Sequence, residues 1–226
     1  MTRASWILSG IVCAALAASA ANAADLSSYR GFQFGAQLSA VAQQAGMKPT
    51  EARLVHQRPA MIQELNFQPN LYRNSASVAD PVSEIQLSFY NAELYRMVVL
   101  YDRYKVAGMM PQDMVEAISA TYGTATKPAT EVAYHSYSSE NAAVIARWED
   151  SQYSYNLVRA EDRSSFALVL YSKDRDPLAQ AAIAESVRLD AEEAPQREAA
   201  RAKKLEEDSR VQQEKSRMEN KANFRP

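Results

Sequence analysis

The stretch that decides the fold is "EIQLSFYNAELYRMVVLYDRY", residues 84–104. Its first part alternates apolar and polar side chains with a period of two, which is typical of a half-buried strand. Asn91-Ala92 follows as a two-residue turn, where both positions need a positive φ that Asn tolerates and Ala accepts less readily. The returning run at 94–101 is apolar on both faces apart from Arg96, so we expect a central strand covered on both sides.

Two registers stay open for this hairpin. A two-residue turn opposes Phe89 and Leu94, whereas a three-residue loop opposes Leu87 and Met97. A slip of one residue turns every side chain to the other face of the sheet. The sequence therefore predicts the hairpin without fixing which of its side chains face the core.

The same arrangement occurs a second time along the chain. Two short helices, at 37–45 and 111–122, each end before a glycine, which is ordinary helix punctuation. Strand-like runs and a hairpin follow each glycine. The second hairpin is "VIARWEDSQYSYNLV", 144–158, and a further strand is expected at 164–172.

We therefore predict an α+β fold of two tandem helix-plus-antiparallel-sheet modules, followed by a charged C-terminal helix. A helix that precedes a β-meander can bury its apolar stripe only against the sheet. The last helix should begin at Asp176-Pro177, with Asp as its N-cap. The expected parts are a signal peptide at 1–23, a first module at 24–105, a second module with its closing helix at 106–189, and a charged helical or disordered tail at 190–226.

The N-terminal segment predicts export. Arg3 precedes an apolar run at 6–18, and "ANA" follows as a small-x-small cleavage site, which is the layout of a secretory signal peptide. The apolar run is shorter than the ~20 residues that a bilayer span needs. We expect cleavage after Ala23, a periplasmic or secreted protein, and no membrane span in the mature form. Cys13, the one cysteine, would leave with the signal peptide, so no disulfide or lipid anchor is expected.

The segment 190–226 differs in composition from the rest of the chain. It contains nine acidic and nine basic residues, and its larger apolar residues are few: Leu205, Val211, Met218 and Phe224. A solvated or frayed helix and a coiled-coil arm both fit this composition, although heptads are not sustained. An oligomer formed through 196–222 therefore stays open. The balanced charge argues against a nucleic-acid or anionic-membrane tether.

The helix–Gly–strands–hairpin motif, which occurs twice between residues 31 and 172, resembles two families of exported proteins. The β-lactamase inhibitor protein is built from tandem helix-plus-meander modules. The SmpA/OmlA outer-membrane assembly lipoproteins place a short helix ending in Gly before a three-stranded meander. This chain departs from the second family by lacking an acylated cysteine and from the first by lacking disulfides, so the resemblance implies a fold and an exported location but no site residue.

No strong catalytic or cofactor motif is present in the sequence, such as a Walker loop, H-E-x-x-H or G-x-S-x-G. His56 and His135 lie at similar places in the two modules, which favours repeated strand positions over a metal site of three or four ligands. Several carboxylates fall at strand ends or turns, where solvated acids are the default: Asp102, Glu149, Asp150, Glu161 and Asp162. We expect no catalytic, cofactor-binding or metal-binding residue, with a paired-carboxylate hydrolase as an alternative.

Tyrosine is the more informative residue type. Most of the 12 tyrosines fall on predicted strands, where aromatic residues are favoured in any case. On an exposed sheet face, tyrosine is also a good contact residue. The first module differs from the second mainly by the loop 68–82, and loops longer than about 12–15 residues are usually functional or disordered. The candidate partner contacts are therefore Tyr72 and Arg73 in this loop, followed by Tyr95 and Tyr155 on the sheet.

These observations predict an exported, non-enzymatic binding protein that recognises a protein, peptide or glycan of the cell envelope. The part at 24–189 carries 15 basic and 18 acidic residues, and this net negative charge argues against nucleic acid. Two alternatives stay open. One is an envelope structural protein that self-associates through its C-terminal helix, and the other is an unrecognised hydrolase.

Overall fold

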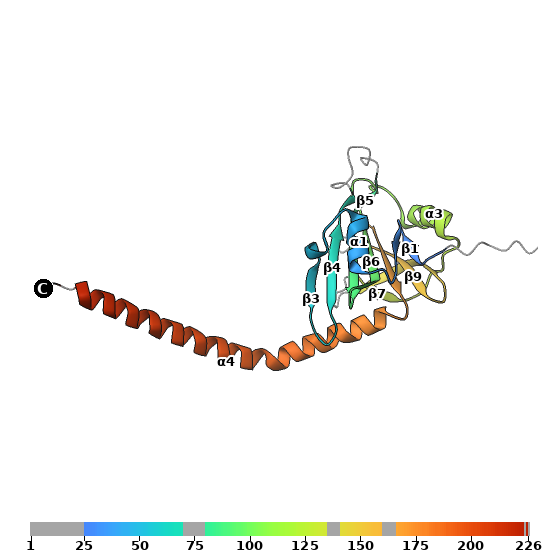
Figure 1. Ribbon diagram of the computed structural model, residues 1–226. Helices are drawn as coiled ribbons and strands as arrows, with labels where there is room; N and C mark the ends of the chain where they lie inside the picture. Colours follow the sequence, from blue (N-terminus) through green and yellow to red (C-terminus); the bar gives the residue numbers. More distant parts are fainter. Residues whose placement is uncertain (1–24, 70–79, 135–140, 160–165, 224, 226) are drawn as a thin grey trace, which may run out of the picture.

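The computed structural model describes residues 25–69, 80–134, 141–159, 166–223 and 225. Within these residues, eight strands form one antiparallel sheet in the order β3-β4-β5-β6-β10-β9-β8-β7 (Figure 1). The strands are β3 (Arg53–His56), β4 (Ile62–Phe67), β5 (Val82–Tyr90), β6 (Glu93–Tyr101), β7 (Glu131–Ala133), β8 (Asn141–Glu149), β9 (Tyr153–Arg159) and β10 (Phe166–Ser172). The predicted α+β class is confirmed.

The sheet consists of two halves of four strands each. Within each half, neighbouring strands are consecutive in the chain, from β3 to β6 in one half and from β10 back to β7 in the other. The halves join where β6 pairs with β10, so the repeated units share one sheet and one core. Counted inward from the outer strand of each half, β8 and β9 occupy the same places as β4 and β5. The turn at 150–152 therefore corresponds to the connection at 68–81, so the prediction that the hairpin at 144–158 repeats the hairpin at 84–104 is wrong.

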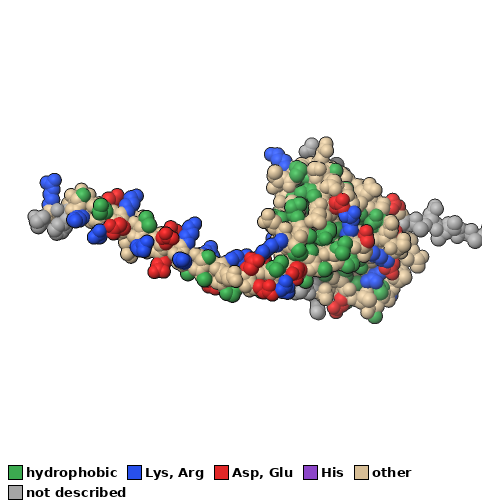
Figure 2. Space-filling view, turned by 60° about the horizontal axis from the view of Figure 1, so that its bottom comes forward, with side chains coloured by type: hydrophobic (Ala, Val, Ile, Leu, Met, Phe, Trp, Pro, Cys, Tyr) green, Lys and Arg blue, Asp and Glu red, His purple; other side chains and the backbone are tan. Residues whose placement is uncertain are grey.

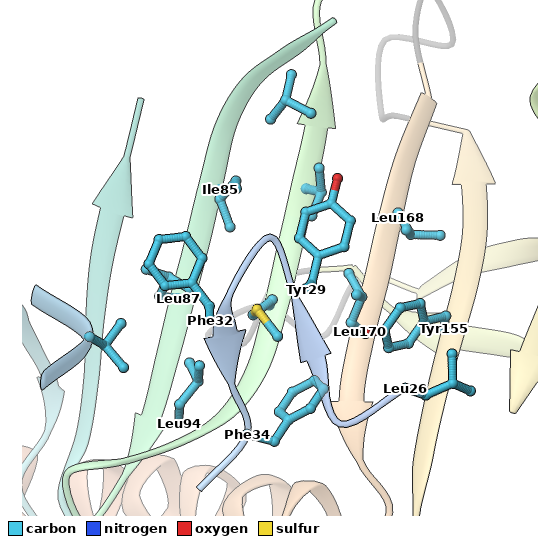
Figure 3. Close-up of a cluster of buried hydrophobic side chains, with 14 of the residues drawn as sticks. Leu26, Tyr29, Phe32, Phe34, Ile85, Leu87, Leu94, Tyr155, Leu168 and Leu170 are labelled. Atoms are coloured by element: carbon cyan, nitrogen blue, oxygen red, sulfur yellow. The ribbon is translucent and has the colours of Figure 1, made fainter. Parts of the chain in front are cut away.

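One face of the sheet is covered by two helices and an N-terminal hairpin. The helices are α1 (Leu38–Ala45) and α3 (Pro111–Tyr122), a short 3₁₀ turn, η1 (Pro49–Glu51), follows α1, and the hairpin joins β1 (Ser28–Tyr29) to β2 (Phe32–Gln33). Figure 3 shows the hairpin over the central strands, with Tyr29, Phe32 and Phe34 pointing at the aliphatic side chains of β5, β6 and β10. The first residues after the predicted cleavage point thus complete the core.

The β5–β6 hairpin contains both registers that the sequence left open. Asn91 and Ala92 have φ values of 49° and 67°, as a type I′ turn requires, and Phe89 opposes Leu94 beside it. A β-bulge then shifts the pairing, so that Leu87 opposes Met97 farther from the turn. A bulge places one extra residue in one strand, so each predicted register is right for one part of the hairpin.

The opposite face of the sheet is also covered near its centre, which confirms the prediction for the returning strand. Val98 of β6 packs in a cluster with residues of β7, β8, β9 and β10. Tyr95 packs against Ile62 and against Ala179 and Ile183 of the last helix, α4 (Asp176–Asn223). β6 is therefore buried from both sides.

Helix α4 begins at Asp176, but Asp176 is its first helical residue and not the predicted N-cap, since the carbonyl of Arg175 accepts the first helical hydrogen bond. The helix passes below β4 and β3 before it extends away from the sheet (Figure 1). We call residues 190–223 of this helix the arm, and the remaining described residues the body. Pro195 lies inside the helix, and Figure 1 shows α4 bending between its two ends. Proline removes one helical hydrogen bond and its ring displaces the preceding turn. Among the described residues, no helix combines the length and hydropathy needed to cross a bilayer.

Candidate functional site

The strand β3 stands at one end of the sheet order that the described residues form. It is short, pairs with β4, and has a register irregularity between Leu54 and His56. Short and bulged edge strands are a common protection against unwanted strand pairing. The Leu54 side chain is nevertheless 50% exposed, so this edge presents apolar surface as well as backbone.

A groove of about 670 Å³ lies where α4 passes this edge. We call it the corner groove, and its lining residues are Leu54, Val55, His56, Gln57 and Arg58 from the sheet side and Ser186, Asp190 and Arg197 from α4. One wall is thus a run of consecutive residues that starts in an edge strand, and the other is a helix. An edge strand beside a helix is a geometry that can accept an extended peptide as an added strand.

Two contacts hold the helix against the strand at this point. Ser186 Oγ lies 2.9 Å from His56 Nδ1, and Ser186 is buried. Arg58 follows β3 and forms a bidentate pair with Glu193, with both nitrogen–oxygen distances at 2.7 Å. This hydrogen bonding lowers the pKa of the Glu193 carboxyl, so the carboxylate that accepts from Arg58 is charged at neutral pH.

Arg197 sits where the helix bends. Its guanidinium donates to the backbone carbonyl of Asp190 at 2.8 Å and to the Asp190 carboxylate at 3.1 Å. Pro195 cannot donate the helical hydrogen bond that would reach the carbonyl of residue 191, and Arg197 donates to the neighbouring carbonyl, that of Asp190. The groove is therefore built around the proline bend.

A second hollow, of about 560 Å³, adjoins the corner groove along the arm. It is lined by Ala194, Arg197, Glu198 and Arg201, and it shares Arg197 with the groove. Figure 2 shows basic and acidic side chains following one another along the arm, whereas hydrophobic side chains gather on the body. The surface that leads out of the groove is thus mainly charged.

Arg96 of β6 is a charged residue buried in the sheet. Its side chain is 0% exposed, pairs with Asp176, donates to the carbonyl of Ala133, and lies over the Tyr171 ring at 5.6 Å. Its Nε has no hydrogen-bond partner among the described residues, nor has the hydroxyl of the neighbouring Ser88. Asp176 is the first residue of α4, so this pair anchors the helix to the centre of the sheet.

The sequence-predicted contact residues fall into two groups. Tyr95 and Tyr155 are both 0% exposed, so the expectation that they lie on an exposed sheet face is wrong. Tyr95 is covered by α4, and Tyr155 donates to the carbonyl of Ser28 at 2.8 Å. Burial raises the pKa of both phenols. Tyr72 and Arg73 lie outside the described residues.

The carboxylates considered for catalysis have structural partners where they are described. Asp102 accepts the backbone amide of Tyr104 at 2.8 Å, and Asp150 accepts that of Tyr153 at 2.7 Å. Glu149 pairs with Lys173. Glu161, Asp162 and His135 lie outside the described residues. Within the part of the chain that the structure describes, no cluster of three or more His, Cys, Asp or Glu could hold a metal ion.

Comparison with known proteins adds nothing to this geometry, because no family model, curated protein or solved structure matches the chain. The resemblance to exported helix-and-meander families therefore stays a prediction. Sequence reasoning missed the corner groove, since its walls lie about 130 residues apart and meet only through the course of α4. One local signal was Pro195 inside a helix-forming segment, which marks the bend where the groove forms.

Proposed function

We propose that this chain is an exported, non-enzymatic binding protein that recognises a protein, peptide or glycan of the cell envelope. The observation that carries the proposal is the corner groove beside the edge strand β3. A binding site of this kind needs a concave surface with apolar contacts and a few polar groups. Leu54 and Val55 supply the apolar contacts, and His56 and Gln57 supply polar groups.

The exported location rests on the signal-peptide layout of residues 1–23. Because the two arginines of the groove already pair with Glu193 and Asp190, an incoming ligand would be recognised mainly by shape and by the strand edge. The loop residues Tyr72 and Arg73 stay candidates for a second contact.

The test is affinity capture of partners from a cell-envelope extract with the exported form of the protein, followed by mass spectrometry. Leu54→Arg, which changes an exposed groove residue, should abolish capture with an unchanged melting temperature. The matched control is Tyr104→Ala, at a residue that is 77% exposed outside the groove, and it should leave capture unchanged. Capture that survives Leu54→Arg but is lost on replacing Tyr72 and Arg73 would move the site to the loop.

A further inference from the structure

The outer part of α4 carries its charges in blocks of alternating sign. Residues 189–200 contain four acidic side chains and one basic, and residues 201–204 contain three basic side chains. Residues 206–208 are all acidic, and residues 210–221 contain four basic side chains and two acidic. Leu205 stands alone between the two middle blocks. The net charges along the helix are therefore −3, +3, −3 and +2.

The two middle blocks and Leu205 face solvent. The ion pairs formed along the arm within the described residues join Arg188 to Glu192, Arg197 to Asp190, and Arg217 to Glu214. None of those described joins a residue of 201–204 to one of 206–208, and every residue of both blocks is exposed. Leu205 is 72% exposed. The most strongly charged part of the helix thus lacks a partner for its charges within the described chain.

We propose that two copies of the chain pair through their arms in antiparallel order, with Leu205 of one copy beside Leu205 of the other. This order places residues 201–204 of each copy opposite residues 206–209 of its partner copy, and residues 189–200 opposite residues 210–221. Every block then faces a block of opposite sign. In a parallel pair in register, each block would lie beside the same block of the other copy, which has the same sign of charge. Charge patterns of this kind decide the orientation of helix pairs.

The two middle blocks lie beyond the bend at Pro195. The stretch 196–214 is centred on Leu205 and lies entirely beyond the proline, so it can pair with itself along its whole length. The full overlap of 189–221 spans about 50 Å of helix at 1.5 Å per residue. Charged pairs with a single central leucine give weak association that salt reduces, which suits an assembly that forms at high local concentration.

The pairing also changes the corner groove. The C-terminal part of one arm, which carries the 60% exposed Met218, comes to lie opposite residues 189–197 of the other copy. Two groove residues, Asp190 and Arg197, belong to this segment. Each groove of the dimer is therefore bounded by both copies. The pairing itself rests on the arm alone and stands whether or not the groove binds an envelope component.

Charge reversal tests the proposal. A basic-block variant carries Arg201→Glu, Lys203→Glu and Lys204→Glu, and an acidic-block variant carries Glu206→Lys, Glu207→Lys and Asp208→Lys. Each alone opposes like charges in the antiparallel pair and should weaken dimerisation at least about tenfold in sedimentation equilibrium at low salt. Mixing the two variants should restore a dimer that contains one chain of each. The variant with all six changes should pair as the natural chain does.

Circular dichroism of each variant checks that the helix still forms. A dimer that is recovered when the two variants are mixed shows that the blocks pair between chains and not within one chain. Cross-linking then tests the orientation. The one cysteine of the sequence is Cys13, inside the predicted signal peptide, so an introduced cysteine is the sole thiol of the exported form. Ala202→Cys mixed with Asp208→Cys should form the mixed disulfide, and Ala202→Cys alone should not cross-link. A natural chain that stays monomeric at low salt, a mixture that does not associate, or a cross-link of Ala202→Cys with itself would each overturn the proposal.

Discussion

The two ends of α4 belong to one continuous helix but lie in opposite surroundings. Between Asp176 and Leu189 the helix buries Ala179, Ala182, Ile183 and Ser186 against the sheet. Beyond residue 190 nearly every side chain is exposed. Helices of this kind draw most of their stability from the packing of an apolar face. The first part is therefore held by the body, whereas the arm depends on its own helix propensity and its charges.

The difference lies in the sequence pattern as well as in the contacts. The first part places small and aliphatic residues on one face, so the helix can approach the sheet closely. In the arm, Leu205, Val211 and Met218 are more than half exposed and charged residues dominate. A helix without an apolar face cannot stabilise a core, but it can extend away from one and reach a partner. Changes of the same chemistry at the two ends should thus have very different effects.

The largest difference is expected for the loss of an aspartate. Asp176→Ala removes the partner of Arg96, which is fully buried, and leaves an uncompensated charge in the core. We expect the free energy of unfolding to fall by about 3–5 kcal/mol. Urea unfolding followed by the fluorescence of the buried Trp148 measures this change.

The matched change in the arm is Asp190→Ala. Asp190 pairs with Arg58 and Arg197 at the surface, with its side chain 48% exposed. Exposed pairs contribute about 0–1 kcal/mol, so the free energy of unfolding should fall by no more than about 1 kcal/mol. Equal effects of the two substitutions would show that Arg96 does not depend on Asp176.

An intermediate difference is expected for apolar residues. Ile183→Ala removes a side chain that packs on Ile62 and Tyr95, and it should reduce the free energy of unfolding by about 2 kcal/mol. Leu205→Ala, measured at a protein concentration where the chain is monomeric, should change it by less than about 0.5 kcal/mol. A large effect of Leu205→Ala in the monomer would mean that the arm folds back on the body.

Much of this fold could be predicted from local patterns. The turn at Asn91-Ala92, the helix ends at Gly46 and Gly123, and the start of α4 at Asp176 each depend on a few neighbouring residues, and the structure has them. Trp148, which lies on the predicted hairpin at 144–158, is 2% exposed and donates to the Gly123 carbonyl at 3.0 Å. Local rules carry this information because capping and turn geometry act within a few residues.

The features that the sequence did not predict all depend on distant partners. The burial of Tyr95 follows from α4, whose Ala179 and Ile183 pack against it although they lie far along the chain. The burial of Tyr155 follows from the N-terminal hairpin, whose Ser28 carbonyl it contacts. The corner groove likewise needs the direction of α4, which no local pattern specifies. A tyrosine in a strand pattern therefore predicts that the residue lies in a sheet, but it does not predict whether the tyrosine side chain is exposed.

A small effect is also expected when the whole arm is removed. Among the described residues, Arg58 forms the ion pairs that join the sheet side of the body to the arm, with Glu193 and Asp190, and Arg188 pairs with Glu192 along the helix. A chain that ends at Leu189 loses these exposed pairs and no buried side chain, so its free energy of unfolding should fall by at most about 1 kcal/mol. Its melting temperature should fall by no more than about 2–4 °C, the shift that 1 kcal/mol produces in a chain of this size.

Arg58→Ala in the full-length chain is the matched control for this truncation, because it removes the ion pairs between the sheet side of the body and the arm and keeps the arm itself. The two changes should have effects of similar size, and their combination should add nothing further, since both remove one interaction. Additive effects would reveal a second contact between the arm and the body. Loss of cooperative unfolding in the truncated chain would show that the arm is part of the folding unit, and the contrast between the two ends of α4 would then be wrong.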